Sequence, residues 1–417
     1  MPESWRRPPV PSLPGNGKAP WLYDGASREL RCSAPDDVIA RLYVCGITPY
    51  DATHIGHANT YLAFDTLQRV WLDAGLEVHY AQNITDVDDP LLERATKTGV
   101  GWRELADQQI ELFRGDMTAL RILPPQDYVA VTEVIDPIAE AVNTLRDRGI
   151  AYPVDTPDSE GDDLYFDIAA AERVAPWRIG DESNLDRDGM LHLSAERGGD
   201  PDRAGKRDPL DPLLWRAARD GEPSWDSVVG PGRPGWHIEC SVIALDHLGH
   251  DFTVQGGGAD LSFPHHEMSA GHAAALSGHP LAKVYSHAGL LSYQGEKMSK
   301  SLGNLVLVSD LLASGVPAAG IRLALLAHRY GEEWEWTDAQ LDEALRRLAR
   351  WRGIREAEEG VSAADVLERV RARLADNLDT PGALAVIDEA AEAGTDDPAL
   401  VRTTVDALLG IDLSPVE

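Results

Sequence analysis

Two histidines and a glutamate stand together in FPHHEMSAGH, residues 263–272. Imidazole nitrogens and carboxylates are common metal ligands, so this stretch raises the question of a metal site. The segment should be helical, and on a helix the residue four positions after His265 shares its face, whereas His266 and Glu267 face differently. That fourth residue is Ser269, whose neutral hydroxyl is a poor ligand. A metal bound here would need further ligands from elsewhere in the chain.

A second group of residues has the chemistry to hold phosphates. In the sequence HIGH, His54 and His57 lie at the start of an expected helix, where free N–H groups and the helix dipole attract anions. Gly56 leaves room for a flat ring to approach the backbone. In KMSKS, Lys297 and Lys300 make a doubly cationic loop. Histidines at a helix start often only cap it, and such a loop can be merely solvated. Together they predict a nucleotide, with the α-phosphate at the histidines and the β,γ-phosphates at the lysines.

The residues around these motifs predict a parallel sheet that would position them. Residues 41–47 read as a buried strand, and a helix with apolar spacing follows from His54 to a closing Gly75. Residues 77–84 form a second expected strand, which completes a βαβ unit. A further helix at 236–249 precedes a strand at 251–255.

The rest of the chain divides into helical and irregular regions. Helical patterns fill roughly 101–149, and from about 153 to 235 the composition shifts toward Asp, Gly, Pro and Arg, as expected of an insertion with loops. Asp86, Asp88 and Asp89 precede a helix beginning near Pro90, and we expect them to cap it. After KMSKS the expected helices lie near 308–328, 338–356, 363–376, 382–393 and 398–409.

Composition favours a cytoplasmic enzyme. The 417 residues carry a formal net charge of −31, which disfavours extensive contact with nucleic-acid phosphates. No apolar run is long enough for a membrane span or a signal peptide. Three cysteines are too few for a disulfide framework, so a reducing compartment is expected, with metal binding or catalysis as the use of any functional thiol.

The ordered motifs resemble those of the class I aminoacyl-tRNA synthetases, whose paired signatures are HIGH and KMSKS. More narrowly, YVCGITPYDATHIGHA, NITDVDD, KRDPLDPLLW, GWHIECS, GGGADLSFPHHE and EKMSKSLGN are similar to the cysteinyl-tRNA synthetase set, over about 41–392. The resemblance implies an α/β fold with a Rossmann-like parallel sheet. It also implies an N-terminal extension (1–40), a catalytic domain (41–310) with an insertion at about 117–235, and a C-terminal helical domain (311–417).

The same resemblance implies a zinc ion that binds the thiolate of substrate cysteine. Matched by motif, its ligands are Cys45, Cys240 and His265, although buried cysteines can also be small hydrophobes. The synthetases add a glutamate at the position of Ser269. Three protein ligands would leave an open position. Trp236, one helical turn before Cys240, can wall the cysteine pocket or simply pack in the core.

Further site residues follow from motif position. His54, Gly56 and His57 should bind ATP together with Lys297, Met298, Ser299, Lys300 and Ser301, and Mg²⁺ should accompany ATP. The aminoacyl-adenylate pocket should be lined by Cys45, Gly46, Ile47, Thr48, Thr60, Asn83, Ile84 and Thr85. Gly258, Ala259 and Asp260 should meet the adenylate ribose, and Leu291 its adenine.

Two departures separate the chain from the synthetases. From Asp338 to the end there are nine arginines, no lysine and 18 acidic residues, which is unsuited to gripping an anticodon stem. The segment AERGGDPDRAG (195–205) is also unlike the synthetases, although by itself it reads as a glycine turn. In both features the chain resembles the mycothiol cysteine ligases. These enzymes join cysteine to the amine of glucosaminyl-inositol through cysteinyl-adenylate.

The resemblance therefore implies a monomeric ligase for cysteine, ATP and glucosaminyl-inositol, with no tRNA partner. His54, His57, Lys297 and Lys300 would be its catalytic residues. Two alternatives stay open: a shortened cysteinyl-tRNA synthetase, which tRNA charging would identify, and a non-catalytic paralogue that acts as a regulatory binder. Intact HIGH and KMSKS motifs disfavour the second.

Overall fold

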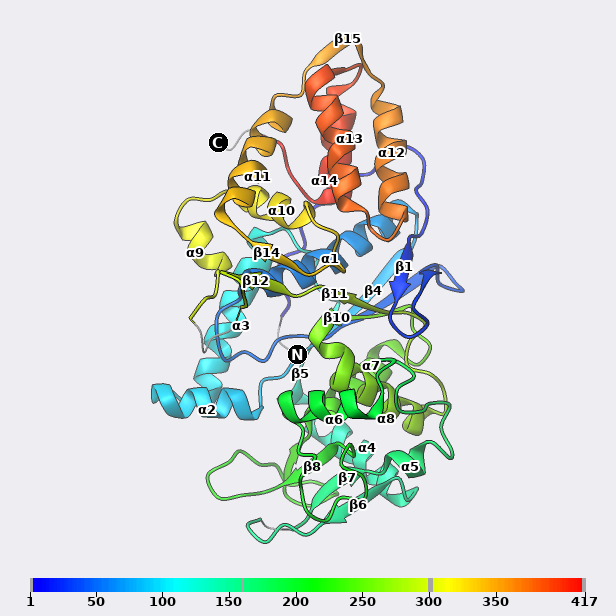
Figure 1. The fold of residues 1–417 in the computed structure, drawn as a ribbon, viewed down its shortest axis with the longest axis vertical. Coiled ribbons are helices and arrows are strands. Elements are labelled where there is room, and N and C mark those ends of the chain that lie inside the picture. The colour runs from blue at the N-terminus through cyan, green and yellow to red at the C-terminus, as the bar shows by residue number, and fades with distance from the viewer. Residues whose placement is uncertain (1–2, 160, 299–302, 415–417) are drawn as a thin grey trace.

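The computed structural model describes residues 3–159, 161–298 and 303–414, and its centre is a five-stranded sheet (Figure 1). The strands lie in the order β11-β10-β3-β4-β5, and all neighbouring pairs are parallel. Their bounds are Ile39–Val44 for β3, Glu77–Ile84 for β4, Asp127–Ala130 for β5, Val254–Gly258 for β10 and Tyr285–Ala288 for β11. The expected α/β class with a parallel sheet is confirmed.

The sheet grows outward from β3 in two directions. The chain first passes from β3 through α1 to β4, and β5 extends that side. Strands β10 and β11 are added later on the other side of β3. In open parallel sheets, ligands bind outside the carboxyl ends of the strands where the order reverses. The crevice beyond the ends of β3 and β10 is therefore the expected ligand site.

Helices cover both faces of this sheet. α1 (Ile55–Asp73) packs on one face and α7 (Trp236–Leu248) on the other. Because successive strand side chains point to opposite faces, Leu42 and Val44 join the core around α1, whereas Tyr43 joins the core around α7. The sheet ends are thus held between two packed layers, which fixes the loops that follow each strand.

Strand β5 corrects the expectation of continuous helix over 101–149. α3 (Trp102–Ala119) and α4 (Ile135–Asp147) are helical, but the four residues of β5 between them pair with β4. So short a run carries little periodicity of its own, and its strand conformation comes from pairing with β4. β5 lies within the span expected to be an insertion, yet it is an edge strand of the central sheet.

The region expected to be mainly loops contains a second sheet. Four antiparallel strands lie in the order β6-β7-β8-β9, at the bottom of the molecule in Figure 1. Two helices accompany them. The bounds are Ala151–Val154 for β6, Asp163–Phe166 for β7, Ile168–Ala171 for α5, Arg187–Glu196 for α6, Leu213–Ala217 for β8 and Gly232–Pro234 for β9.

The C-terminal part is helical, as expected, apart from short strands. The segment expected as one helix near 308–328 is two, α9 and α10, because Gly315 has a positive φ and Pro317 follows it. The bounds are Val308–Ala313 for α9, Ala318–Leu326 for α10, Asp338–Arg352 for α11, Ala363–Ala375 for α12, Thr380–Ala393 for α13 and Pro398–Leu409 for α14. The strands are Leu291–Tyr293 (β12), Glu296–Lys297 (β13), Trp334–Trp336 (β14) and Glu356–Val361 (β15).

A buried charge cluster joins these helices to the sheet. Asp65 of α1 accepts from Arg69 of the same helix and from Arg322 of α10, and all three side chains are almost fully buried. Arg322 also donates to the carbonyl of Leu409 at the end of α14. Each charge therefore has partners on other elements, which fixes α1 against the C-terminal helices.

The N-terminal extension is packed against the rest of the molecule. The indole of Trp5 is buried and donates to the carbonyl of Ile122 over 2.8 Å. β1 (Trp21–Asp24) and β2 (Glu29–Cys32) form an antiparallel hairpin. Within the described parts of the chain, no helix has both the length and the apolar character needed to cross a membrane.

Candidate active site

A cavity of about 1060 Å³ lies beyond the ends of β3 and β10, where the strand order reverses. Its wall includes the loop after β3 with the start of α1, the residues after β4, the start of α7, the loop after β10 and the insertion. Its lining includes Cys45, His54, His57, Trp236 and Asp260. Residues of the metal, nucleotide and cysteine motifs therefore meet at one cleft.

The thiol and imidazole groups expected to hold zinc converge at the metal end of this cleft. Cys45 follows β3, Cys240 lies on α7, and His265 lies in a kinked turn, Ser262–His266, in which Phe263 has an extended backbone. The Cys45 and Cys240 sulfurs are 3.9 Å apart, and the Cys240 sulfur lies 3.2 Å from Nε2 of His265. All three are buried, and their ligand atoms lie within 4.8 Å of one another.

The chemistry of this cluster fits a soft divalent cation. Burial and the neighbouring Cys45 thiol raise the pKa of Cys240, so a positive charge is needed to favour its thiolate. Burial lowers the pKa of His265, so its ring is neutral and keeps a lone pair for a metal. Two thiolates and one neutral imidazole are a zinc-type donor set. The group can therefore hold zinc.

Two neighbours orient the His265 ring. Nδ1 of His237 lies 3.0 Å from Nδ1 of His265, on the side of the ring away from the cysteines. Trp236 stacks on the same imidazole, with ring centroids 4.3 Å apart. Such outer contacts set the tautomer and direction of a ligand ring. The Trp236 side chain both packs and lines the cleft, so its two expected roles are compatible.

The remaining polar residues of FPHHEMSAGH point elsewhere, with one exception. Ser269 donates its hydroxyl proton to the carbonyl of His237, 3.1 Å away. Glu267 accepts from backbone N–H groups, including that of Ser183. His266, expected to face away, instead has Nε2 3.3 Å from the sulfur of Cys45. The expectation assumed a regular helix, but α8 (Glu267–Ser277) begins only after the kinked turn.

At the start of α1 the two histidines of HIGH form a cap. His54 is the N-cap of α1, and its Nδ1 accepts from the N–H of Gly56 over 3.1 Å. Nδ1 of His57 accepts from the N–H of His54 over 3.4 Å, and the two rings stack. A methyl group at Gly56 would lie 2.9 Å from the His54 ring. Both histidines line the cleft while capping α1.

The lysine motif is only partly described. Lys297 ends β13, where the description covers its backbone, and Met298 is buried and lines the cleft. Ser299, Lys300 and Ser301 lie outside the described residues. The expected role of the two lysines stays a prediction.

Most residues expected around the adenylate reach the cleft, and their binding roles stay predictions. The lining includes Gly46, Ile47, Thr48, Thr60, Gly258, Asp260 and Leu291. Asn83, Ile84 and Thr85 are instead buried behind the wall. The Asn83 amide oxygen accepts from the N–H of Gly46 over 2.8 Å, so Asn83 supports the loop that carries Cys45. Ala259 begins a 3₁₀ turn, Ala259–Leu261, beside this wall.

Asp88 is confirmed as a cap. It is the N-cap of α2 (Asp89–Thr98), and its carboxylate accepts from the N–H of Asp89. Asp88 also lines the cleft, and burial raises its pKa to about 6. Asp86 does not cap α2, as was expected, because its carboxylate accepts from the backbone N–H and the hydroxyl of Thr132 instead.

The segment read as a glycine turn is both a turn and a wall of the cleft. Gly198 has a φ of +84°, as a turn after α6 requires. Residues 196–200 all line the cavity. The guanidinium of Arg197 donates to the carbonyls of Asp260 and Phe263, on the loop that precedes His265. In the sequence, the only signal for this wall was that the segment 195–205 departs from the synthetase pattern.

Comparison with known proteins agrees with this layout. The tRNA synthetases class I (C) catalytic domain matches residues 33–346. The structure is similar to Mycobacterium tuberculosis methionyl-tRNA synthetase in complex with methionyl-adenylate, with a TM-score of 0.60, 15% identity and 89% of each chain covered. A putative arginyl-tRNA synthetase from Campylobacter jejuni gives a TM-score of 0.56 at 13% identity, with 90% of this chain and 93% of that chain covered.

The fold and the cleft at its reversal point thus define a catalytic unit of the class I aminoacyl-tRNA synthetase type. Curated relatives narrow this further. The chain is 61% identical to the L-cysteine:1D-myo-inositol 2-amino-2-deoxy-alpha-D-glucopyranoside ligase of Clavibacter michiganensis, with 98% of each chain covered. It is 60% identical to the ligase of the same name from Thermobispora bispora, with 98% of this chain and 100% of the relative covered. The chain belongs to this family of cysteine ligases.

Proposed function

We propose that the protein ligates L-cysteine to the amine of glucosaminyl-inositol, using ATP and forming cysteinyl-adenylate on the way. The cysteine carboxylate attacks the α-phosphate of ATP and releases pyrophosphate. The amino-sugar nitrogen then attacks the acyl carbon, and AMP leaves as the amide forms. The observation that carries the proposal is one cleft that is lined by Cys45 of the buried Cys45, Cys240 and His265 group, by the N-terminus of α1 and by a polar wall of the insertion. High identity to cysteine ligases over nearly the full chain supports it.

The start of α1 is proposed to bind the α-phosphate. His54 and His57 lie in the cleft at the positive end of the α1 dipole, where negative charge is stabilised. Lys297 and Lys300 are proposed to neutralise the departing pyrophosphate, with Mg²⁺ bound to ATP. Groups aimed at charge that develops in the transition state increase the rate rather than the affinity for the substrate.

Cys45, Cys240 and His265 are proposed to hold zinc and thereby to select cysteine. A bound zinc would supply a ligand position at which the substrate thiol is held as a thiolate. His237 and Trp236 fix the ring of His265 for this task. Serine, which has a less acidic and harder hydroxyl, would leave that contact unmade. Size alone distinguishes such close analogues by only about 10- to 200-fold.

Product analysis tests the function directly. The purified protein with cysteine, ATP, Mg²⁺ and glucosaminyl-inositol should give the cysteinyl amide, AMP and pyrophosphate in equal amounts, as measured by mass spectrometry and nucleotide chromatography. Omission of the amino sugar should leave cysteine-dependent ATP–pyrophosphate exchange intact. An absence of exchange with cysteine, or ADP in place of AMP, would contradict the proposal.

A further inference from the structure

The insertion lines a part of the cleft that is separate from the sheet ends. The cleft has a volume of about 1060 Å³, at the upper end of what is typical for small-molecule sites. The thiol cluster and the start of α1 occupy the sides formed by the sheet ends and α7. The insertion contributes a separate wall, residues 194–200, at the end of α6.

The backbone of this wall has a defined shape. The N–H of Gly199 donates to the carbonyl of Ser194, and a methyl group on Gly199 would lie 2.2 Å from the Ser194 hydroxyl. Gly198 supplies the positive φ that reverses the chain. A larger residue would be strained at Gly198 by the positive φ and would collide with Ser194 at Gly199, so the two glycines allow the chain to turn back across the end of α6.

Arg197 clamps the wall to the loop that carries the reacting groups. Its guanidinium donates to the carbonyl of Asp260 over 2.6 Å and also to that of Phe263. Asp260 lines the cleft, and Phe263 lies two residues before His265. The end of α6 is therefore fixed against the proposed adenylate and metal ends of the cleft.

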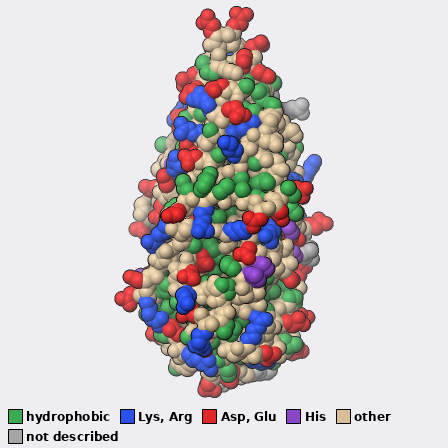
Figure 2. Space-filling view, turned by 90° about the vertical axis from the view of Figure 1, so that its right-hand side faces the viewer, with side chains coloured by type: hydrophobic (Ala, Val, Ile, Leu, Met, Phe, Trp, Pro, Cys, Tyr) green, Lys and Arg blue, Asp and Glu red, His purple; other side chains and the backbone are tan. Residues whose placement is uncertain are grey.

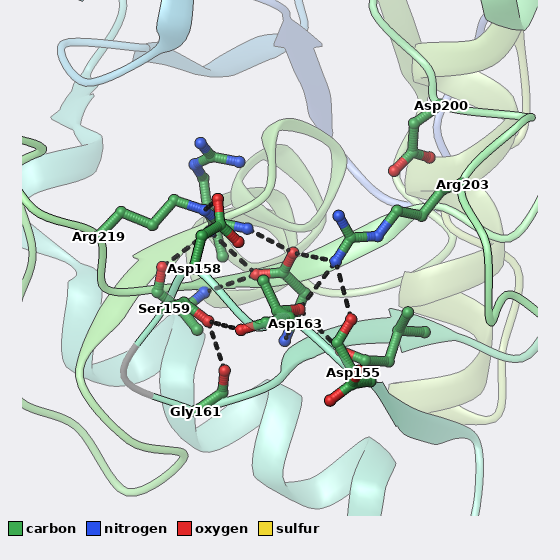
Figure 3. A network of polar contacts seen from close by, with 12 residues as sticks. Asp155, Asp158, Ser159, Gly161, Asp163, Asp200, Arg203 and Arg219 are labelled. Atoms are coloured by element: carbon green, nitrogen blue, oxygen red, sulfur yellow. Dashed lines mark hydrogen bonds and ion pairs between the residues drawn. The ribbon is translucent and has the colours of Figure 1, made fainter.

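The following loop is clamped to the sheet of the insertion (Figure 3). Asp200 accepts from the Tyr165 hydroxyl on β7 and from Lys206, whose Nζ lies 2.8 Å away. Arg203 donates to the buried carboxylate of Asp163, which also accepts from Arg219. Figure 3 shows these guanidinium groups directed at Asp163 from two sides. The wall is thus anchored at both ends.

On the part of the cleft that the insertion lines, Glu196 differs from Asp200 and Asp211. The Asp200 carboxylate accepts hydrogen bonds from Tyr165 and Lys206. The Asp211 carboxylate accepts from the Tyr152 hydroxyl and from backbone N–H groups. Glu196 also lines the cleft, but its side chain is 56% exposed and pairs with the exposed imidazole of His192, 3.3 Å away. Its carboxylate can therefore exchange that contact for a ligand at small cost.

We propose that residues 194–200 form the acceptor subsite and that the Glu196 carboxylate binds the acceptor, a polyhydroxylated amine. A carboxylate accepts hydrogen bonds from ammonium and hydroxyl groups, whereas it repels the phosphates of a nucleic-acid acceptor. The position of the wall beside Asp260 would hold such a ligand next to the adenylate. This inference rests on the proposed function, since it assigns the second substrate of that reaction.

Glu196→Gln tests the subsite, because it keeps the shape of the side chain and removes the charge. The Michaelis constant for the amino sugar should rise about 10- to 100-fold, as expected for loss of a hydrogen bond to a charged group. Cysteine-dependent ATP–pyrophosphate exchange and the Michaelis constants for cysteine and ATP should stay at wild-type values. Asp188→Asn is the matched control, since Asp188 is exposed on the first turn of α6 and does not line the cleft.

The acceptor subsite and the proposed function can be contradicted separately. An unchanged Michaelis constant for the amino sugar in Glu196→Gln, in an enzyme that ligates it, would overturn the subsite alone. An equal rise in Asp188→Asn would also overturn it, since the effect would then come from net charge. A wild-type protein that neither exchanges pyrophosphate nor forms the amide would contradict the proposed function and remove the subsite with it.

Discussion

At the scale of single residues, the candidate metal centre is built from parts that lie far apart in the sequence. Cys45 and Cys240 are 195 positions apart, yet their sulfurs are 3.9 Å apart. Cys45 lies just past the end of β3, and α7 packs on that strand from the other side. Packing of the two elements therefore brings both thiols to the site. His265 joins them because the kinked turn before α8 places its Nε2 beside Cys240.

The zinc content of purified variants should distinguish Cys240, a proposed ligand, from its buried neighbour Ser269. Cys240→Ala removes a proposed ligand, so the zinc retained after purification should fall well below that of the wild type, as measured by plasma mass spectrometry. Ser269→Ala is the control, because its hydroxyl donates to the His237 carbonyl instead. That variant should keep its zinc and lose only about 1 kcal/mol of stability. Equal zinc loss in both variants would assign Ser269 to the metal.

Cobalt substitution tests whether the substrate sulfur joins the metal. Three protein ligands leave a fourth tetrahedral position for the cysteine thiolate. Thiolate-to-cobalt charge-transfer absorption should therefore intensify on addition of cysteine and stay unchanged with serine. Cysteine methyl ester is a useful control, because it keeps the thiol but lacks the reacting carboxylate. No spectral change at saturating cysteine would mean that the metal is structural.

Sequence information located the main groups at this scale and misplaced several side chains. The Cys45, Cys240 and His265 set came from motif matching, since spacing alone is uninformative across 220 residues. His266 was placed by helical geometry that the turn does not follow. Asn83 was expected in the pocket wall, but its amide holds the N–H of Gly46 from behind. This hydrogen bond depends on how the ends of β3 and β4 lie beside each other, and the sequence of one strand alone does not specify that.

At the scale of elements, long periodic segments were predictable and short ones were not. The strand expected at 77–84 matches β4, and the helix expected from His54 matches α1 within its cap. β5 and the strands β6–β9 are three to five residues long, so their conformation follows from partners rather than from their own pattern. The contact between the turn after α6 and the loop of Asp260 was likewise not predictable, because it depends on where the Arg197 side chain lies in the folded chain.

Asp116 on α3 gives an element-scale prediction for the pH dependence of stability. Burial raises its pKa to about 7, and repulsion from Asp310 on α9 adds to this. The folded state therefore holds the proton more tightly than the unfolded state, whose carboxyl titrates near 4. Stability contributed by this group is full below about pH 4 and is lost as pH rises through about 7.

Asp116→Asn should abolish the loss of folding stability that ionisation of Asp116 causes at high pH. The variant should melt about 2 °C or more above the wild type at pH 8, and the difference should shrink as pH falls toward 5, as measured by calorimetry. Asp107→Asn, at an exposed position of the same helix, should leave the wild-type pH profile unchanged. A difference in melting temperature that does not vary with pH would contradict a titrating Asp116.

At the scale of the whole molecule, charge and connectivity describe a catalytic unit with an acidic helical end. The cluster of Asp65, Arg69 and Arg322 fixes α1, and with it the nucleotide end of the cleft, to the C-terminal helices. At the far tip, β15 exposes Glu356, Glu358 and Glu359, and acidic side chains gather at that end in Figure 2. The helical part thus supports the site, and its tip repels polyanions.

The last prediction is therefore that the acceptor is an amino sugar and not tRNA. With a net charge of −31 and an acidic C-terminal part, phosphate contacts would meet repulsion over much of the surface. Aminoacylation by the purified protein should favour glucosaminyl-inositol over tRNA by orders of magnitude in kcat/KM, and tRNA should not inhibit the amide-forming reaction at physiological salt. A genuine cysteinyl-tRNA synthetase assayed in parallel controls for the quality of the tRNA. Comparable charging of both acceptors would instead identify a shortened synthetase, and Glu196 would then face an RNA end.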